Sequence, residues 1–272
     1  PVSEVKNFWD KKPCNSGWNF PGLTQGTKKR FIAVEKRRYK VEPHSYDFAG
    51  FATSGGLRVL EIGGGICTDS MSFAKNGASV TVVDLSTESL ALCRKRFQIF
   101  GLPSTIYQGS AMELDTFLPE QKFDVIYSYG VIHHMPEPEK CICQLKNYLA
   151  EDGELRIMLY SKFSYKLFQV MKENNLWDFA RLDAIIAKYS EAQTGSPVTY
   201  TYTYNEVNEM LFRCGFKVKK IWKDHIFTYN IEKYKQNVLE VLPEFQGILP
   251  ETFAQMKAEL GWHMMIKAQH LT

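Results

Sequence analysis

Short β-rich runs alternate with helical segments between residues 57 and 160, and this alternation limits the fold more than any other feature of the sequence. The runs are rich in Val, Ile, Leu and Tyr, and turn signals and helical patterns separate them. Strands that alternate with helices in this way form a parallel sheet with crossover helices on its faces. We predict five strands in this region, at residues 57–62, 79–85, 105–108, 123–128 and 154–160.

Capping residues mark where the crossover helices begin and end. Ser86 is a good N-cap for the helix after the second strand, and Gly101 is a good C-terminal stop for it. Pro138 has the fixed φ that suits the first turn of a helix after the fourth strand. These signals predict helices at residues 87–100 and 138–149, and Thr68 or Asp69 caps another after the first strand.

The rest of the chain adds longer helical segments and two further strands. A helical pattern rich in large apolar residues covers 165–189, and Asn205 is placed to cap a helix before the sixth strand. We therefore predict an α/β fold: a doubly wound, mostly parallel, Rossmann-like seven-stranded sheet with an N-terminal helical cap and helical lid insertions. The predicted segments are the cap at 1–56, the sheet domain at 57–272, the insertions at 161–204 and 228–260, and the last two strands at 216–222 and 262–268.

Composition excludes several classes of protein. Hydrophobic residues make up 44% and charged residues 23% of the 272 residues, as in an ordinary globular protein and unlike a disordered or fibrous one. The longest apolar runs fall far short of the roughly 18 residues that a membrane helix needs, and the first residues lack a signal-peptide pattern. We expect no membrane partner and a cytoplasmic location.

The six cysteines are scattered along the chain and do not form a dense disulfide pattern. We expect reduced thiols. Cys141 and Cys143 are two positions apart on a predicted helix, so their side chains point about 200° apart and cannot chelate one ion together. We expect no metal site.

Residues 28–40 carry a local excess of positive charge, although the formal net charge of the whole chain is only +3. Such a stretch suits an anionic partner such as a nucleic acid. It equally suits the solvated face of an amphipathic helix on which Phe31, Val34 and the stem of Arg38 pack inward. We favour the helix interpretation because such charge runs are common on surface helices.

A glycine-rich turn follows directly on the first predicted strand. Gly63 and Gly65 allow a ligand to approach the backbone closely, and the helix that follows offers free N–H groups. Thr68 stands where the dinucleotide-binding fingerprint requires its third glycine, which disfavours a pyrophosphate ligand. Asp84 ends the second strand 21 residues after Gly63, where an acidic side chain can accept hydrogen bonds from ribose hydroxyls. The pattern favours an adenosine-containing ligand without a pyrophosphate.

The motif Glu61-x-Gly63-x-Gly65, together with Asp84, resembles that of the class I S-adenosylmethionine-dependent methyltransferases, in particular bacterial small-molecule members. In that family the glycine turn abuts the methionine part of the cofactor, the acid after the second strand holds the ribose, and residues after the third strand meet the adenine. The specific resemblance covers residues 57–160, with Ser110 departing from the Asp that the family more often has. It implies S-adenosylmethionine as cofactor and these cofactor-binding residues: Glu61, Gly63, Gly64, Gly65, Asp69, Asp84, Leu85, Ser110, Ala111, Met112 and Ser128.

Candidate catalytic residues lie at the end of the fourth and fifth predicted strands. His133 and His134 come just beyond the fourth strand, where an open α/β sheet has its ligand crevice, and either imidazole can accept a proton near pH 7. Tyr160 ends the fifth strand at the same rim. A structural role of the histidine pair in shaping the cofactor loop is equally open. Weaker candidates for substrate contacts are Glu42, His44, His225 and Tyr229.

These features together predict a methyltransferase that transfers the methyl group of S-adenosylmethionine to a small or medium-sized organic acceptor through an oxygen, nitrogen or carbon nucleophile. A pocket covered by helices favours a small-molecule substrate over a nucleic acid. Two alternatives stay open: an RNA or tRNA methyltransferase, motivated by residues 28–40, and a nucleotide-dependent oxidoreductase on a related fold, which Thr68 disfavours. The sequence does not determine the oligomeric state.

Overall fold

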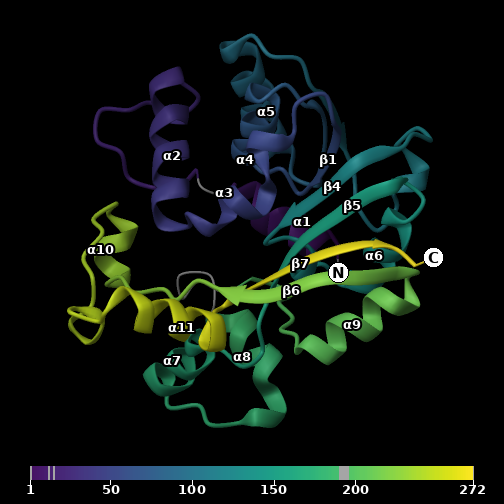
Figure 1. Cartoon of the computed structure of the whole chain (residues 1–272). Helices are drawn as coiled ribbons and strands as arrows, with labels where there is room; N and C mark the ends of the chain where they lie inside the picture. Colours follow the sequence, from purple (N-terminus) through teal and green to yellow (C-terminus); the bar gives the residue numbers. More distant parts are fainter. Residues whose placement is uncertain (1, 12, 15, 190–195, 272) are drawn as a thin grey trace.

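One seven-stranded sheet organises the chain, whose computed structural model describes residues 2–11, 13–14, 16–189 and 196–271. The strand order is β3-β2-β1-β4-β5-β7-β6 (Figure 1). All neighbouring strands are parallel except β7, which runs antiparallel to both β5 and β6. The predicted doubly wound, mostly parallel sheet is confirmed. The strands are β1 (Arg58–Ile62), β2 (Ser79–Asp84), β3 (Thr105–Gln108), β4 (Phe123–Tyr129), β5 (Leu149–Tyr160), β6 (Phe216–Asp224) and β7 (His263–His270).

Helices cover both faces of this sheet. Buried residues of α3 (His44–Ala49), α4 (Thr68–Lys75) and α5 (Thr87–Phe100) pack with one face, and those of α6 (Pro138–Leu145) and α9 (Tyr204–Arg213) pack with the other. Figure 1 shows α4 and α5 above the sheet and α9 below it in that view. Successive side chains of a strand point to opposite faces, so Val59 joins the first core and Leu60 the second. This explains why the central strands are apolar without alternation.

The predicted ends of the second crossover helix match the structure, whereas several other boundaries do not. The N-cap of α4 is Cys67, so neither Thr68 nor Asp69 caps that helix. The Ser86 hydroxyl accepts a hydrogen bond from the backbone of Ser89, and Gly101 ends the same helix with φ 65°. The cap of α9 is Thr203 instead of Asn205, because Thr203 forms a reciprocal capping box with Glu206. Two differences concern the joint of α6 and β5. The helix stops at Leu145 and the strand begins at Leu149, and the register between β4 and β5 shifts between Phe123 and Val125.

Helical segments also lie outside the sheet, in the regions where the cap and the insertions are predicted. The N-terminal part contains α1 (Val2–Lys11), α2 (Lys28–Val41) and the one-turn η1 (Phe51–Thr53). The single helical pattern predicted at 165–189 is broken at Asn175, which has a left-handed φ of 51°. The other helical segments are α7 (Tyr165–Asn174), η4 (Phe179–Arg181), α8 (Leu182–Tyr189), α10 (Ile231–Lys235), η5 (Pro243–Phe245) and α11 (Pro250–Leu260), with η2 (Leu114–Thr116) and η3 (Ile132–His134) within the sheet domain. Among the described residues, no helix combines the length and apolarity needed to cross a membrane.

The expectation of reduced thiols is wrong at four positions. Cys67 is bonded to Cys93 and Cys143 to Cys214, with Cα–Cα distances of 5.0 and 4.4 Å. The partners are 26 and 71 residues apart in sequence, so only the packing of α4 against α5 and of α6 against α9 brings them together. Scattered spacing therefore concealed both pairs.

Candidate active site

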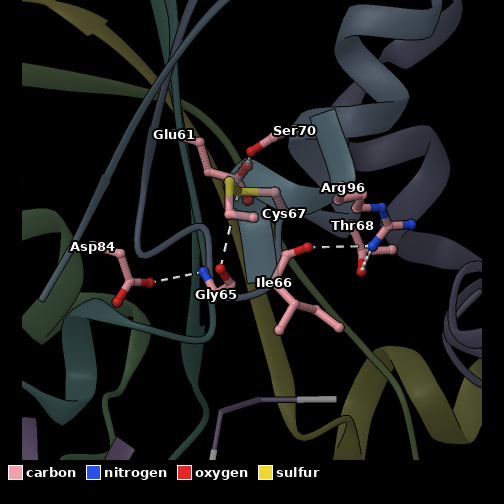
Figure 2. The surroundings of a disulfide bond; sticks show 9 residues. Glu61, Gly65, Ile66, Cys67, Thr68, Ser70, Asp84 and Arg96 are labelled. Atoms are coloured by element: carbon pink, nitrogen blue, oxygen red, sulfur yellow. Dashed lines mark hydrogen bonds between the residues drawn. A yellow bond between two sulfur atoms is a disulfide. The ribbon is translucent and has the colours of Figure 1, made fainter. Parts of the chain in front are cut away.

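The glycine turn after β1 has a backbone that other residues would not adopt easily. Gly63 and Gly65 have φ of 75° and 54°, in the left-handed region that favours glycine. A Cβ atom on Gly63 would overlap the side chain of Val131, which packs against the turn. Asp84 at the end of β2 accepts hydrogen bonds from the backbone N–H of Gly65 at 2.7 Å and of Ser86 at 2.8 Å. Figure 2 shows the Asp84–Gly65 bond, which joins the turn to the second strand.

Buried groups hold this turn from beneath. The buried Glu61 carboxylate accepts a hydrogen bond from the Ser70 hydroxyl, and burial raises the pKa of the Glu61 carboxyl well above its usual range. The guanidinium of the fully buried Arg96 donates to the Thr68 hydroxyl at 2.7 Å (Figure 2). The disulfide at Cys67 anchors the start of α4 to α5. These contacts fix the turn in one shape before any ligand binds.

A cavity of about 680 Å³ lies along the edge of the sheet where the parallel strands end. Its size is within the range of small-molecule sites. One end is lined by residues 63–65, by Asp84 and Leu85, and by residues 110–112. The other end is lined by Glu42, Tyr129, Tyr160, His225 and His263. The cavity is also lined by side chains of α1, including Phe8 and Trp9, and of residues 227–235. From the insertion at 161–204, Lys166 lines it.

The first end of the cavity fits S-adenosylmethionine. The glycine turn leaves room for a close ligand: a Cβ on Gly65 would meet nothing nearer than Cys14 at 3.8 Å. Burial raises the pKa of the Asp84 carboxyl, while the N–H groups of Ser86 and Gly65 favour the charged form. Asp84 and Leu85 would hold the ribose side, and the backbone of residues 110–112 the adenine. The Ser110 hydroxyl accepts a hydrogen bond from the Met112 backbone at 3.3 Å, so it stabilises the loop at the position where the family more often has Asp.

Three of the predicted site residues have other tasks in the structure. Ser128 does not line the cavity, because its hydroxyl donates to the carbonyl of Ile62 inside the sheet at 3.1 Å. Asp69 does line the cavity, but its carboxylate accepts hydrogen bonds from the hydroxyls of Tyr127 at 2.8 Å and Tyr39 at 3.0 Å. Tyr229 lies outside the cavity lining and pairs with Val241 in an isolated bridge.

The histidine pair divides between the core and the cavity. His133 is fully buried, away from the cavity lining, and neither of its ring nitrogens has a hydrogen-bond partner among the described residues. Burial lowers the pKa of His133 well below its usual range. His134 lines the cavity, and its Nδ1 lies 3.0 Å from both the Val198 carbonyl and the Thr199 hydroxyl. Tyr160 also lines the cavity, with its ring stacked on Trp262 at 4.1 Å.

Two weaker candidates, His44 and His225, lie together with a residue to which the sequence analysis assigned no role. His263 opens β7, and its ring centroid lies 5.3 Å from that of His44 and 4.3 Å from that of His225. Because β7 is antiparallel to its neighbours, its first residue lies at the edge where β5 and β6 end. Tyr129, the last residue of β4, contacts the same cluster and was also missed.

Known proteins match part of the sheet domain in sequence. The methyltransferase domain family matches residues 60–157. The chain is 36% identical over 105 residues to the ubiquinone biosynthesis O-methyltransferase of Actinobacillus pleuropneumoniae serotype 7, covering 37% of this chain and 44% of that protein. It is 30% identical over 112 residues to the phosphatidylethanolamine N-methyltransferase of Cereibacter sphaeroides, covering 40% of this chain and 54% of that one. An uncharacterized Synechococcus protein is 29% identical over 118 residues, which are 43% of this chain and 28% of that protein. The chain thus matches about half or less of each of these relatives.

Solved structures share the fold across nearly the whole chain. Magnesium protoporphyrin IX methyltransferase from Synechocystis with bound S-adenosylhomocysteine superimposes with a TM-score of 0.61 at 13% identity, covering 98% of this chain and 99% of that one. The [4+2]-cyclase SpnF superimposes with a TM-score of 0.59 at 14% identity, covering 99% and 96%. The fold is therefore shared with proteins of different activity. Residues 60–157 thus match the methyltransferase domain family, and the fold of the whole chain is that of a solved methyltransferase with bound S-adenosylhomocysteine.

Proposed function

We propose that the protein transfers a methyl group from S-adenosylmethionine to a small or medium-sized organic acceptor. The observation that carries this proposal is the cavity itself, in which the cofactor-binding end at Gly63 and Asp84 is continuous with a polar end at Tyr129, His225 and His263. A cofactor at the first end leaves the second end for the acceptor. The relatives that match parts of the chain are named as O- and N-methyltransferases, so they support methyl transfer without selecting the attacked atom.

In this proposal, residues of the chain position the acceptor and remove a proton from it. S-adenosylmethionine supplies an electrophilic methyl group on a sulfonium, and the protein has to align a nucleophile opposite to it and keep water away. Phe8 and Trp9 of α1 line the cavity and exclude water from it. The Val198 carbonyl is an acceptor, so it holds the proton of His134 on Nδ1 and leaves the lone pair on Nε2. His134 is therefore the candidate general base, whereas the burial of His133 favours the structural role for that residue.

Substitution of His134 tests this assignment. We expect His134→Ala to lower the turnover number by about 100-fold or more, the usual contribution of a general base, with a smaller change in the affinity for S-adenosylhomocysteine. Turnover is measured as S-adenosylhomocysteine released from labelled S-adenosylmethionine with a panel of hydroxyl and amine acceptors. An equal loss of turnover and of cofactor affinity would assign His134 to the structural frame of the site.

The RNA alternative is weakened by the basic stretch on which it depended. Arg30, Arg37 and Arg38 are all buried, and Arg38 is paired with Glu42. The inward packing predicted for this helix is thus confirmed, and three of its cations are not available to phosphates. An RNA-binding protein would show tRNA binding that weakens steeply with salt. We expect no such binding.

The oxidoreductase alternative is weakened at Thr68. This residue stands at the position of the third glycine of the dinucleotide fingerprint, and its hydroxyl accepts a hydrogen bond from the buried Arg96. A side chain fixed in that place obstructs the close helix packing that the fingerprint provides. Calorimetric titration with NADH beside S-adenosylhomocysteine separates the two functions. Binding of NADH alone would overturn the methyltransferase proposal.

A further inference from the structure

Three histidines from distant parts of the chain meet at the polar end of the cavity. His44 begins α3, His225 follows β6, and His263 opens β7. Each offers one ring nitrogen, and the three nitrogens lie within 4.8 Å of one another. No other group of this kind occurs among the residues that the structure describes. The cluster thus has the residue type that most often binds transition metals in proteins.

The distances in the cluster match those between ligands of one metal ion. Nε2 of His44 and Nδ1 of His263 are 3.0 Å apart, and the Tyr129 hydroxyl oxygen lies 2.9 Å from the first and 3.0 Å from the second. An ion with metal–nitrogen distances of about 2.0–2.1 Å separates adjacent ligands by about 3.0–3.4 Å. The His225 ring is stacked on that of His263 with an interplanar angle of 19°, and its ligand nitrogen lies within 4.8 Å of the other two.

Two carboxylates lie near the cluster, and each is also paired with a cation, Glu42 with Arg38 and Asp224 with Lys257. The carboxylate of Glu42 lies 3.8 Å from Nδ1 of His263 and accepts a hydrogen bond from the Tyr129 hydroxyl at 2.9 Å. In its neutral form an imidazole offers the nitrogen lone pair that ligates a metal ion. The cluster therefore combines nitrogen donors with a carboxylate that it shares with Arg38.

The surroundings of His44 and His225 resemble the outer shell of a metal site. Oδ1 of Asp224 lies 3.8 Å from Nδ1 of His44, on the side of the ring opposite Nε2. Carboxylates that accept a hydrogen bond from a ligating imidazole orient it in metalloproteins, and Asp224 would have to approach His44 more closely to do so. His225 has a left-handed φ of 69°, and its backbone N–H is held by Asp224 at 2.6 Å. Non-glycine residues in that region cluster at functional sites.

We propose that His44, His225 and His263 bind one divalent transition-metal ion of the Zn²⁺ type, with Glu42 beside it. Two of the three histidines, His225 and His263, line the cavity together with Glu42 and Tyr129, whereas His44 does not. The ion would therefore have an open position on the side of His225 and His263. An open position next to three histidines is the arrangement of catalytic metal sites. This role of the ion rests on the proposed function: the ion would bind a hydroxyl or carboxylate oxygen of the methyl acceptor and orient that oxygen toward the cofactor-binding end of the cavity.

Metal binding is tested on the full chain after removal of metals with a chelator. Titration calorimetry with Zn²⁺ and elemental analysis are expected to give one ion per chain, and Co²⁺ a visible absorption band. His263→Ala should weaken Zn²⁺ binding by more than about 100-fold, beyond the 10–100-fold that loss of an outer-shell partner costs. His225→Asn is the second variant, to be used if His263→Ala does not fold, and it should weaken Zn²⁺ binding by the same factor.

His270→Ala is the matched control, because His270 is the last residue of β7 and its Nε2 lies 3.2 Å from the Leu149 carbonyl. We expect it to bind Zn²⁺ as the wild type does. Absence of saturable binding, or equal losses in His263→Ala and His270→Ala, would overturn the metal site and leave the cluster as a hydrogen-bonded network.

The open position is tested with acetohydroxamate, an oxygen chelator. A shift of the Co²⁺ band on its addition is expected, and an unchanged band would overturn the proposed oxygen-bearing acceptor. Affinity for S-adenosylhomocysteine is measured in parallel. Its loss would contradict the proposed function, whereas its retention without metal binding would contradict this inference alone.

Discussion

Asp84→Asn removes a negative charge at the ribose end of the cavity with little change of shape. In the native protein its two carboxylate oxygens accept hydrogen bonds from Gly65 at 2.7 Å and Ser86 at 2.8 Å. An amide retains one acceptor and places an NH₂ group where the other oxygen was. One of these two bonds then becomes a contact between two donors, and the ribose hydroxyls lose a charged acceptor.

The size of the effect follows from the number of bonds involved. A hydrogen bond to a charged group contributes about 1.5–3 kcal/mol. Loss of one such bond to the ribose raises the dissociation constant for S-adenosylhomocysteine by roughly 10- to 150-fold. The free protein also loses stability, by about 1–3 kcal/mol, because a buried N–H group of the turn loses its partner. Calorimetry gives the first quantity and urea unfolding of the free protein the second.

Asp124→Asn is the matched control. Asp124 lies near the start of β4, at the opposite end of the strands, and binds Arg58 in a pair whose side chains are 31% and 53% exposed. Such surface pairs contribute about 0–1 kcal/mol to stability, and we expect cofactor affinity to be unchanged. If folded Asp84→Asn protein binds S-adenosylhomocysteine as the control does, Asp84 does not hold the ribose.

Three further substitutions probe the site and the fold. Gly63→Val should abolish binding of S-adenosylhomocysteine in calorimetry, because φ of 75° and the side chain of Val131 leave no room for it; retained binding would refute the turn assignment. His133→Leu should flatten the pH dependence of the free energy of unfolding in urea. In the native protein the buried imidazole stays neutral, whereas in the unfolded chain it takes up a proton below about pH 6.5. His133 therefore lowers the stability of the native protein as the pH falls, by up to about 2 kcal/mol at pH 5. An unaltered slope would show that His133 is protonated in the folded protein. Cys143→Ser should lower the free energy of unfolding by about 4 kcal/mol under oxidising conditions, as expected for loss of a cross-link to Cys214 over 71 residues. Equal stability of the wild-type protein with and without reductant would argue against this bond.

The sheet was predictable because its signals are local. Apolar runs identified the strands, and Ser86 and Gly101 marked one helix correctly at both ends. The helix was predicted to run to residue 149, which is wrong because Leu149 pairs with Phe123 and already belongs to the sheet, a tertiary effect.

The polar end of the cavity could not be predicted in the same way. His44 and His263 are 219 residues apart, and their contact depends on β7 entering the sheet antiparallel between β5 and β6. No local signal in the sequence specifies that order. Ser128 shows the converse difficulty, since it lies in a motif at the right edge of the sheet but its side chain bonds to Ile62 within it.

Titration of the wild-type protein with S-adenosylhomocysteine tests the central claim most directly. We expect one molecule to bind per chain, and at 100 times its dissociation constant to stabilise the protein against unfolding by about 2.7 kcal/mol. The same titration with Asp84→Asn should show the loss of affinity given above. Absence of both binding and stabilisation in the folded wild-type protein would contradict the assignment of Gly63 and Asp84 to a cofactor site.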